Sequence, residues 1–182
     1  TLENNQMRFN NNWGIASNGN NATISHNIAN ENNNGIAIDG LFSYVLDNTA
    51  NNNEQCGIAM RGDYGILRRN IANNNDWYGF VCGAGRYQNG TVFGGNYSNI
   101  SENSAYNNTE IGLWSIVPYV MIYNNSVSNN ANNGIVIEGD QTDLIRNYVD
   151  SNYNTGINAI GNGSSISDNI VNNNIYGIVI SH

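Results

Sequence analysis

The sequence predicts an all-β solenoid of about eight coils, and three observations support this prediction. A glycine followed by a bulky apolar residue recurs along the 182 residues, most often at intervals of 22. Apolar residues and asparagines also recur at fixed positions after each glycine. A constant repeat of this length is typical of solenoids, in which each repeat buries its apolar side by stacking on its neighbours. The repeat glycines are Gly14, Gly35, Gly57, Gly79, Gly112, Gly134, Gly156 and Gly177.

Each repeat is expected to contain three short strands. With the repeat glycine as position 0, apolar residues occupy positions +1 and +3, which is the alternation of a strand with one face against a core. Further apolar residues at +10 and +15 mark two more strands. Examples in the second repeat are Ile36, Ile38, Val45 and Ala50. Segments rich in Asn and Gly separate the strands, so we expect three bends in each coil.

Asparagine supplies the other half of the repeat. Asn tolerates left-handed backbone geometry at bends, and its amide both donates and accepts hydrogen bonds. Identical amides stacked on successive coils are therefore expected to bond to one another as ladders. The ladder at position +13 contains Asn27, Asn48, Asn70, Asn103, Asn125, Asn147 and Asn169. The ladder at position +18 contains Asn32, Asn53, Asn75, Asn108, Asn130, Asn152 and Asn174.

One interval is longer than the others. Gly79 and Gly112 are 33 residues apart, which is one repeat with eleven extra residues. Ile100 and Asn103 resume the repeat pattern, so the extra residues are expected in a loop over about 83–96. Insertions in solenoids map to loops on one face, and that face often has a function.

Composition limits the classes of function. We expect a single domain over 1–182, since the composition does not change along the chain. There is no run of 18 apolar residues and no signal-like start, so neither a membrane span nor an unprocessed precursor is expected. The net charge is −8, with six arginines and no lysine, which argues against nucleic acid as a partner. We expect an extracellular or cell-surface protein, with the periplasm as an alternative.

The two cysteines occupy different positions on successive coils. Cys56 lies just before its repeat glycine and Cys82 three residues after the next one. They are therefore about 13 Å apart along the strands, too far for a disulfide. Cys82 is expected in the core, whereas the state of Cys56 is left open.

The repeat unit G-I-x-I-x-G, followed by N-x-A/V-x-x-N, resembles the right-handed parallel β-helix of the pectate-lyase-like superfamily. It is most similar to Asn-rich repeats of archaeal cell-surface proteins and of NosD-like periplasmic proteins. The resemblance covers essentially Leu2 to His182. It implies a right-handed parallel β-helix, but the superfamily includes lyases, epimerases, hydrolases, adhesins and structural proteins.

The residues favour a protein that is not an enzyme, although the question stays open. Lyases of this fold use Lys or Arg as the base, and this chain lacks lysine; alginate epimerases carry a D-P-H motif, which is also missing. No catalytic residue, metal site or cofactor is assigned. His26 and His182 lie at different repeat positions near opposite ends. Outward charged residues are candidates for acid–base catalysis, but we expect them to be solvated coil surface; they are Asp39, Arg61, Asp63, Glu138, Asp140 and Asp143.

Aromatic residues gather around the insertion and suggest a surface for carbohydrate or a partner. Exposed rings beside a guanidinium can stack on sugar rings; the alternative is that these rings only pack over the loop. The candidates are Trp77, Tyr78, Arg86, Tyr87, Tyr97, Trp114 and Tyr119. Candidate glycosylation sites, all outside the ladders, are Asn21, Asn89, Asn96, Asn99, Asn107, Asn124 and Asn162.

Three functions follow as hypotheses. The first is a structural protein that assembles head-to-tail into a filament or acts in adhesion, because neither end of the repeat shows a cap. The second is a polysaccharide-binding or polysaccharide-degrading module. The third is a periplasmic protein of the NosD type. The partners expected are further copies of the chain and glycans.

Overall fold

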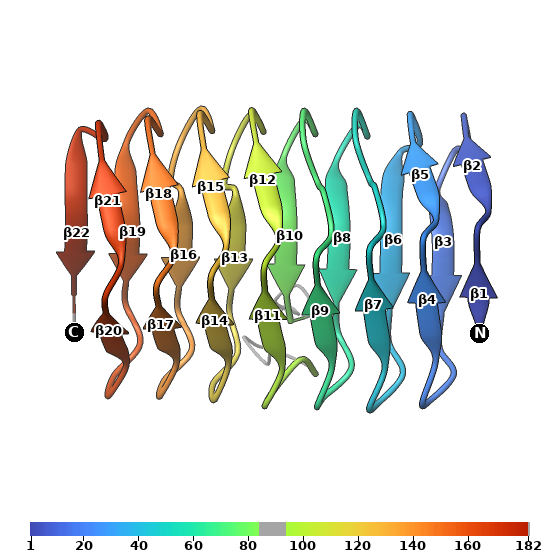
Figure 1. Ribbon diagram of the computed structural model, residues 1–182, viewed down its shortest axis with the longest axis horizontal. Coiled ribbons are helices and arrows are strands. Elements are labelled where there is room, and N and C mark those ends of the chain that lie inside the picture. The colour runs from blue at the N-terminus through green and yellow to red at the C-terminus, as the bar shows by residue number, and fades with distance from the viewer. Residues whose placement is uncertain (84–93, 182) are drawn as a thin grey trace, which may run out of the picture.

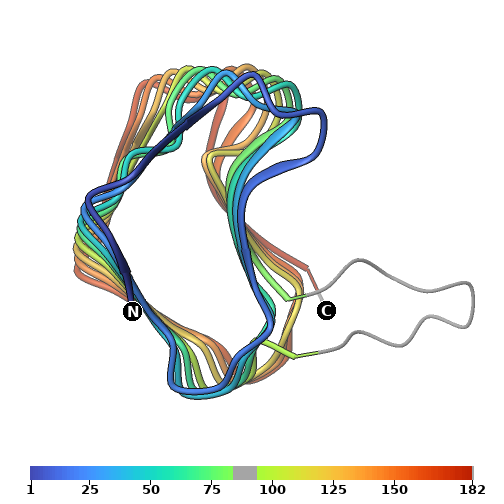
Figure 2. The ribbon, with the colours of Figure 1, turned by 90° about the vertical axis from the view of Figure 1, so that its right-hand side faces the viewer.

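The computed structural model describes residues 1–83 and 94–181, which wind into a rod of stacked coils (Figure 1). Seen from the N-terminal end, the chain runs clockwise as it recedes from the viewer, so the coil is right-handed (Figure 2). Every strand pair among these residues is parallel. The predicted right-handed parallel β-helix is confirmed. No helix in the described part of the chain is long and apolar enough to cross a membrane.

The strands form three faces along the rod. The first sheet contains β1 (Leu2–Glu3), β4 (Thr23–Ser25), β7 (Tyr44–Leu46), β9 (Ile66–Arg68), β11 (Asn99–Ser101), β14 (Met121–Tyr123), β17 (Asp143–Ile145) and β20 (Ser165–Ser167). The second face contains β2 (Gln6–Arg8), β5 (Ile28–Asn30), β12 (Ser104–Tyr106), β15 (Ser126–Ser128), β18 (Tyr148–Asp150) and β21 (Ile170–Asn172), joined between β5 and β12 by single bridges through Thr49 and Ile71. The third sheet contains β3 (Trp13–Ser17), β6 (Asn34–Ile38), β8 (Cys56–Met60), β10 (Tyr78–Cys82), β13 (Leu113–Ser115), β16 (Ile135–Ile137), β19 (Thr155–Ala159) and β22 (Tyr176–Ile180).

The interior of the rod is apolar, as the repeat predicted. Ile36, Ile38 and Val45 have no exposed surface. Cys82 is also fully buried, and both cysteines are free, so the prediction that they are not bridged is confirmed. Burial raises the pKa of each thiol to about 12, with the result that Cys56 and Cys82 remain protonated at neutral pH.

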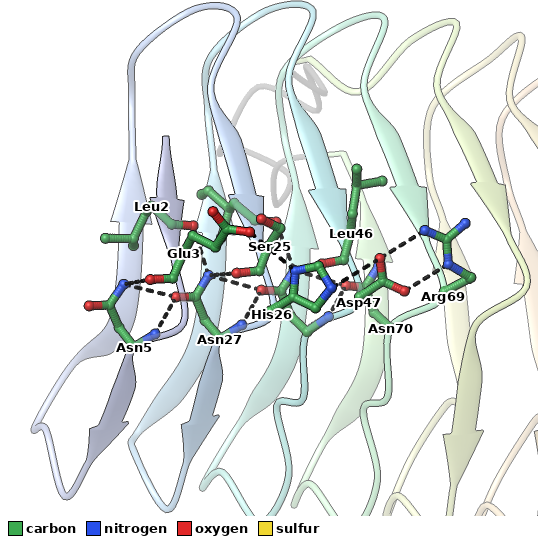
Figure 3. Close-up of polar contacts among 12 residues, drawn as sticks. Leu2, Glu3, Asn5, Ser25, His26, Asn27, Leu46, Asp47, Arg69 and Asn70 are labelled. Carbon is green, nitrogen blue, oxygen red and sulfur yellow. Dashed lines mark hydrogen bonds and ion pairs between the residues drawn. The ribbon is translucent and has the colours of Figure 1, made fainter.

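Hydrogen bonds between asparagine amides join the coils (Figure 3). The main-chain N–H and Nδ2 of Asn48 both donate to Oδ1 of Asn70, at 2.9 and 3.0 Å, and Nδ2 also donates to the carbonyl of Ile24 at 2.9 Å. Each amide therefore connects three successive coils. The same bond links every member of the two series named above, which extend back to Asn5 and Asn10.

At two of the three bends of each coil, the left-handed residue lies one position before the ladder asparagine, so the ladder asparagine is not itself the left-handed residue, contrary to the prediction. His26, Asp47 and Arg69 have φ angles of 54°, 57° and 55°. This conformation costs roughly 1–2 kcal/mol for a residue with a Cβ. The following asparagine then directs both its main-chain N–H and its amide toward the next coil. The ladder bonds thus offset the strain of the bend.

The repeat glycine is required by space and not by backbone conformation. A Cβ on Gly35 would lie 2.2 Å from the carbonyl oxygen of Gly57, 2.9 Å from Cβ of Ala50 and 3.0 Å from Nδ2 of Asn53. At position 0, the backbone of the third sheet lies so close to the next coil and to the second face that no side chain fits there.

The strands before and after the insertion keep their pairing register with the preceding coil. Cys82 pairs with Met60, and Asn99 pairs with Ile66, so the eleven extra residues lie between Cys82 and Asn99. Residues 84–93, which make up most of the loop predicted at 83–96, lie outside the described residues.

Loss of one ladder amide should destabilise the protein more than loss of a surface amide. Asn70→Ala leaves the donors of Asn48 without their acceptor in the interior, and we expect a loss of about 1–3 kcal/mol. Asn158→Ala is the control, because Asn158 lies on the outer side of β19 at a position that holds alanine in earlier coils. Urea unfolding measures both variants; equal free energies of unfolding would contradict the importance of the ladder.

Candidate carbohydrate-binding surface

The aromatic residues suggested as one platform lie on two different faces. Trp77, Tyr78 and Trp114 lie on or beside the outer side of β10 and β13 in the third sheet. Tyr97 and Tyr119 lie at the bend that precedes the first sheet. Arg86 and Tyr87 fall outside the described residues. The insertion separates the two groups along the chain.

The first group, Trp77, Tyr78 and Trp114, is called the outer aromatic cluster below. The rings of Tyr78 and Trp114 are 5.1 Å apart and tilted by 53°, and Trp77 meets Tyr78 edge-on at 6.2 Å. Nε1 of Trp114 donates to Oε1 of Glu138 at 3.1 Å, which fixes the indole on the surface. Trp77 is half exposed. Burial, together with the charge of Glu110, raises the pKa of Tyr78, so its hydroxyl remains a neutral donor.

The N-terminal part of the same sheet carries a further aromatic contact. The guanidinium of Arg61 lies 5.4 Å from the ring centroid of Trp13, a distance suited to a cation–π interaction. Arg61 also donates from Nη2 to Asp39 at 3.1 Å. Outward alanines Ala37 and Ala59 of this sheet are 1% and 6% exposed. Larger side chains therefore cover the outer side of β6 and β8.

The bend before the first sheet carries a stack of four aromatic rings, Phe42, Tyr64, Tyr97 and Tyr119, called the aromatic column below. Successive ring centroids are 4.9, 5.1 and 4.8 Å apart, with interplanar angles of 10°, 8° and 6°. All four residues are left-handed. Sequence reasoning missed Phe42 and Tyr64, although all four share one repeat position. Because the rings stack on one another, only their edges and the two end faces are open to a ligand.

The acidic residues weighed as catalytic candidates mostly contact neighbouring coils. Oδ1 of Asp63 accepts hydrogen bonds from both N and Nδ2 of Asn96, each at 2.9 Å. Oδ1 of Asp140 accepts from the main chain of Asn162 at 2.7 Å. Among the residues that the structure describes, no three His, Cys, Asp or Glu side chains group closely enough to hold a metal ion.

A column of charged residues follows the bend beside the first asparagine ladder (Figure 3). His26 lies 3.6 Å from Glu3 and 3.9 Å from Asp47, and Arg69 donates to both carboxylate oxygens of Asp47 at 2.7 and 2.8 Å. The hydrogen bond from Arg69 lowers the pKa of Asp47. Glu102, at the same repeat position, is bonded instead to Arg68, at 2.8 Å. Each of these ion pairs joins residues of two different coils, so the column holds the coils together.

The candidate glycosylation sites differ in accessibility. Asn21, Asn107, Asn124 and Asn162 are exposed, whereas Asn96 and Asn99 are partly buried and Asn89 lies outside the described residues. Attachment at the four exposed asparagines remains a prediction.

No protein-family model and no curated protein sequence matches the chain. Among solved structures, the chain is similar to the periplasmic alginate epimerase AlgG, with a TM-score of 0.65 and 17% identity over 93% of this chain and 48% of the epimerase. A D-to-A mutant of the same epimerase gives a TM-score of 0.62 and 16% identity. The chain thus spans about half the length of these structures. At this identity the likeness establishes the fold alone, a right-handed parallel β-helix.

The Asp47–Arg69 ion pair should make stability depend on pH. Arg69 lowers the pKa of Asp47 in the folded chain below the ordinary value of 3.8, so the stabilisation is present above that value and is lost as the pH falls through the lower folded pKa. Asp47→Asn should therefore lower the Tm near pH 7, and the difference from the unsubstituted protein should shrink as the pH falls below 3.8. Asp168→Asn, at an equivalent bend where the pair with Arg146 is 3.9 Å long and more exposed, should have the smaller effect near pH 7. A Tm difference for Asp47→Asn that stays constant with pH would contradict this assignment.

Proposed function

We propose that this chain is an extracellular or periplasmic β-helix module that binds polysaccharide without cleaving it. The observation that carries the proposal is the outer aromatic cluster, in which half-exposed Trp77 lies beside Tyr78 and Trp114 on a rigid sheet. Aromatic faces stack well on the apolar faces of sugar rings. A rod with parallel strands gives such rings a fixed spacing along an extended polymer.

Three further observations support this function. The neighbour of known structure is a polysaccharide epimerase, and it is periplasmic. Charged residues make up only 11% of the chain, which suits an extracellular surface. Most of the outward carboxylates on and near the third sheet, including Asp39 and Asp63, already bond to side chains of neighbouring coils, which favours binding over acid–base catalysis.

Removal of Trp77 should weaken glycan binding. We expect Trp77→Ala to raise the Kd about fivefold to tenfold, because one stacking contact is worth about 1 kcal/mol. Tyr153→Ala is the matched control, since Tyr153 is an exposed aromatic residue three coils further along the rod. Affinity electrophoresis against neutral and acidic polysaccharides measures binding, and product analysis tests for cleavage. Equal affinity for the two variants would reject the outer aromatic cluster as the binding face, and a product that accumulates with time would overturn binding without cleavage.

We also propose that the rods stack head-to-tail, as a second function with its own supporting observation. Both asparagine ladders are polar. Asn5 and Asn10 act only as donors in the ladders, so each has a free Oδ1, whereas Asn169 and Asn174 only accept ladder bonds. The two ends of the rod are therefore chemically complementary. At the C-terminal end, Ile178 and Ile180 are 46% and 59% exposed.

Further coils placed against these ends would extend both ladders and cover the isoleucines. A second copy of the chain supplies such coils, and so would additional repeats of a longer polypeptide. A head-to-tail contact between copies does not close, so it builds a filament.

The charge of one end residue should control assembly. We expect the protein to form filaments at high concentration, visible by negative stain, and Ile180→Lys to prevent them without lowering the Tm, because the side chain is already exposed in the single rod. Tyr153→Lys, on the side of the rod, should leave assembly unchanged. Sedimentation that gives a monomer for the unsubstituted protein at every concentration would reject stacking between copies.

A further inference from the structure

A surface cavity of about 450 Å³ lies where the aromatic column ends. It faces the first sheet and is thus distinct from the outer aromatic cluster on the third sheet. Its lining includes two tyrosines, one exposed apolar side chain, an amide and a carboxylate, whereas the side chain of Val120 is buried in the core. The lining residues are Tyr97, Tyr119, Val120, Met121, Gln141, Asp143 and Gly163.

The cavity lies where the aromatic column stops. In the two coils after Tyr119, the same bend position holds Gln141 and Gly163. Tyr119, Gln141 and Gly163 have φ angles of 61°, 52° and 65°, so the backbone of the bend is unchanged and only the side chains differ. On one side the ring of Tyr119 stacks on Tyr97. On the other side the column has no further aromatic ring within the described residues.

Asp143 is the second notable feature of this cavity. It lies on β17 between Met121 of β14 and Ser165 of β20. Its side chain is half-buried, yet its carboxylate forms no hydrogen bond or ion pair with the described residues. Asp39 and Asp63, by contrast, are bonded to Arg61 and Asn96. A partly buried carboxylate without a partner has unused capacity to accept hydrogen bonds.

We propose that this cavity binds one neutral sugar ring of a polysaccharide. Two adjacent hydroxyls of the ring donate to the carboxylate of Asp143, while the amide of Gln141 both donates and accepts. Tyr119 and Met121 provide the apolar wall against which the sugar packs. The proposal rests on the proposed glycan-binding function and adds the class of glycan to it.

The charge of the site selects against uronates. A sugar carboxylate in the cavity would face Asp143 on a chain whose net charge is −8, and like charges brought together in this way reject a ligand. The polymer bound is therefore one of neutral sugars. In this respect the chain differs from its structural neighbour, whose name specifies alginate.

Two variants test the cavity by independent means. Asp143→Asn removes the charge-assisted hydrogen bonds, and we expect binding of a neutral hexasaccharide, from a glucan or a galactan, to weaken at least about tenfold. Gln141→Tyr extends the aromatic column by one ring, as the left-handed Tyr64, Tyr97 and Tyr119 already do, and should fill the cavity without lowering the Tm. Asp168→Asn and Tyr153→Ala are the controls and should bind as the unsubstituted protein does. Saturation-transfer NMR measures binding, with a galacturonate hexasaccharide for comparison.

Each outcome separates this proposal from the function on which it rests. Loss of binding in Asp143→Asn and Gln141→Tyr, but not in Trp77→Ala, supports the cavity and rejects the third sheet as the binding face. Loss in Trp77→Ala alone keeps the proposed function and overturns the cavity. Tighter binding of the galacturonate than of the neutral hexasaccharides also overturns the cavity. If no glycan binds, both proposals are wrong.

Discussion

A hydrogen bond between the amides of equivalent asparagines, repeated from coil to coil, supports the rest of this structure. Each bond from Asn48 to Asn70 fixes two coils at strand spacing, and the additional bond to Ile24 includes a third coil. The bond also makes the left-handed bends tolerable, because the residue before each ladder asparagine adopts a strained conformation. The cross-section of the rod therefore depends on amides that, from Asn27 to Asn152, are buried inside it.

This dependence explains which parts of the fold could be predicted from the sequence. A side chain inside the rod packs against the side chains at the same repeat position in the coils before and after it. Apolar residues therefore recur at the positions of Ile36 and Val45, and asparagine recurs at the position of Asn48, so the period is visible in the sequence. The left-handed bends were not predicted at the correct positions. Rules for turns favour glycine and asparagine there, whereas the structure places His26 and Arg69 in that conformation. The role of the repeat glycine also required coordinates, because a recurring glycine can reflect either close approach between coils or a positive φ.

The repeat constrains the residues of the outer surface less than those of the interior, because outward side chains contact water. Position in the repeat correctly placed Trp77 and Trp114 near the insertion but did not show that Tyr97 lies on another face. The aromatic column crosses the insertion, so Tyr97 follows Tyr64 at an interval of 33 residues in place of 22, which hid the period. The state of Asp143 could not be predicted either. Whether a carboxylate has a partner depends on side chains from neighbouring coils, and the repeat position alone does not show which of those side chains reach it.

The polarity of the ladders gives folding a direction. The donors of each coil face the acceptor of the coil that follows it in the chain, while Nδ2 also bonds to a carbonyl of the coil before. During synthesis from the N-terminus, the earlier coil is therefore already available as a template. Each new coil then satisfies the donors that its predecessor presents, and growth proceeds one coil at a time from a preformed edge. A chain of this design can lengthen by whole repeats without altering the order in which its coils fold.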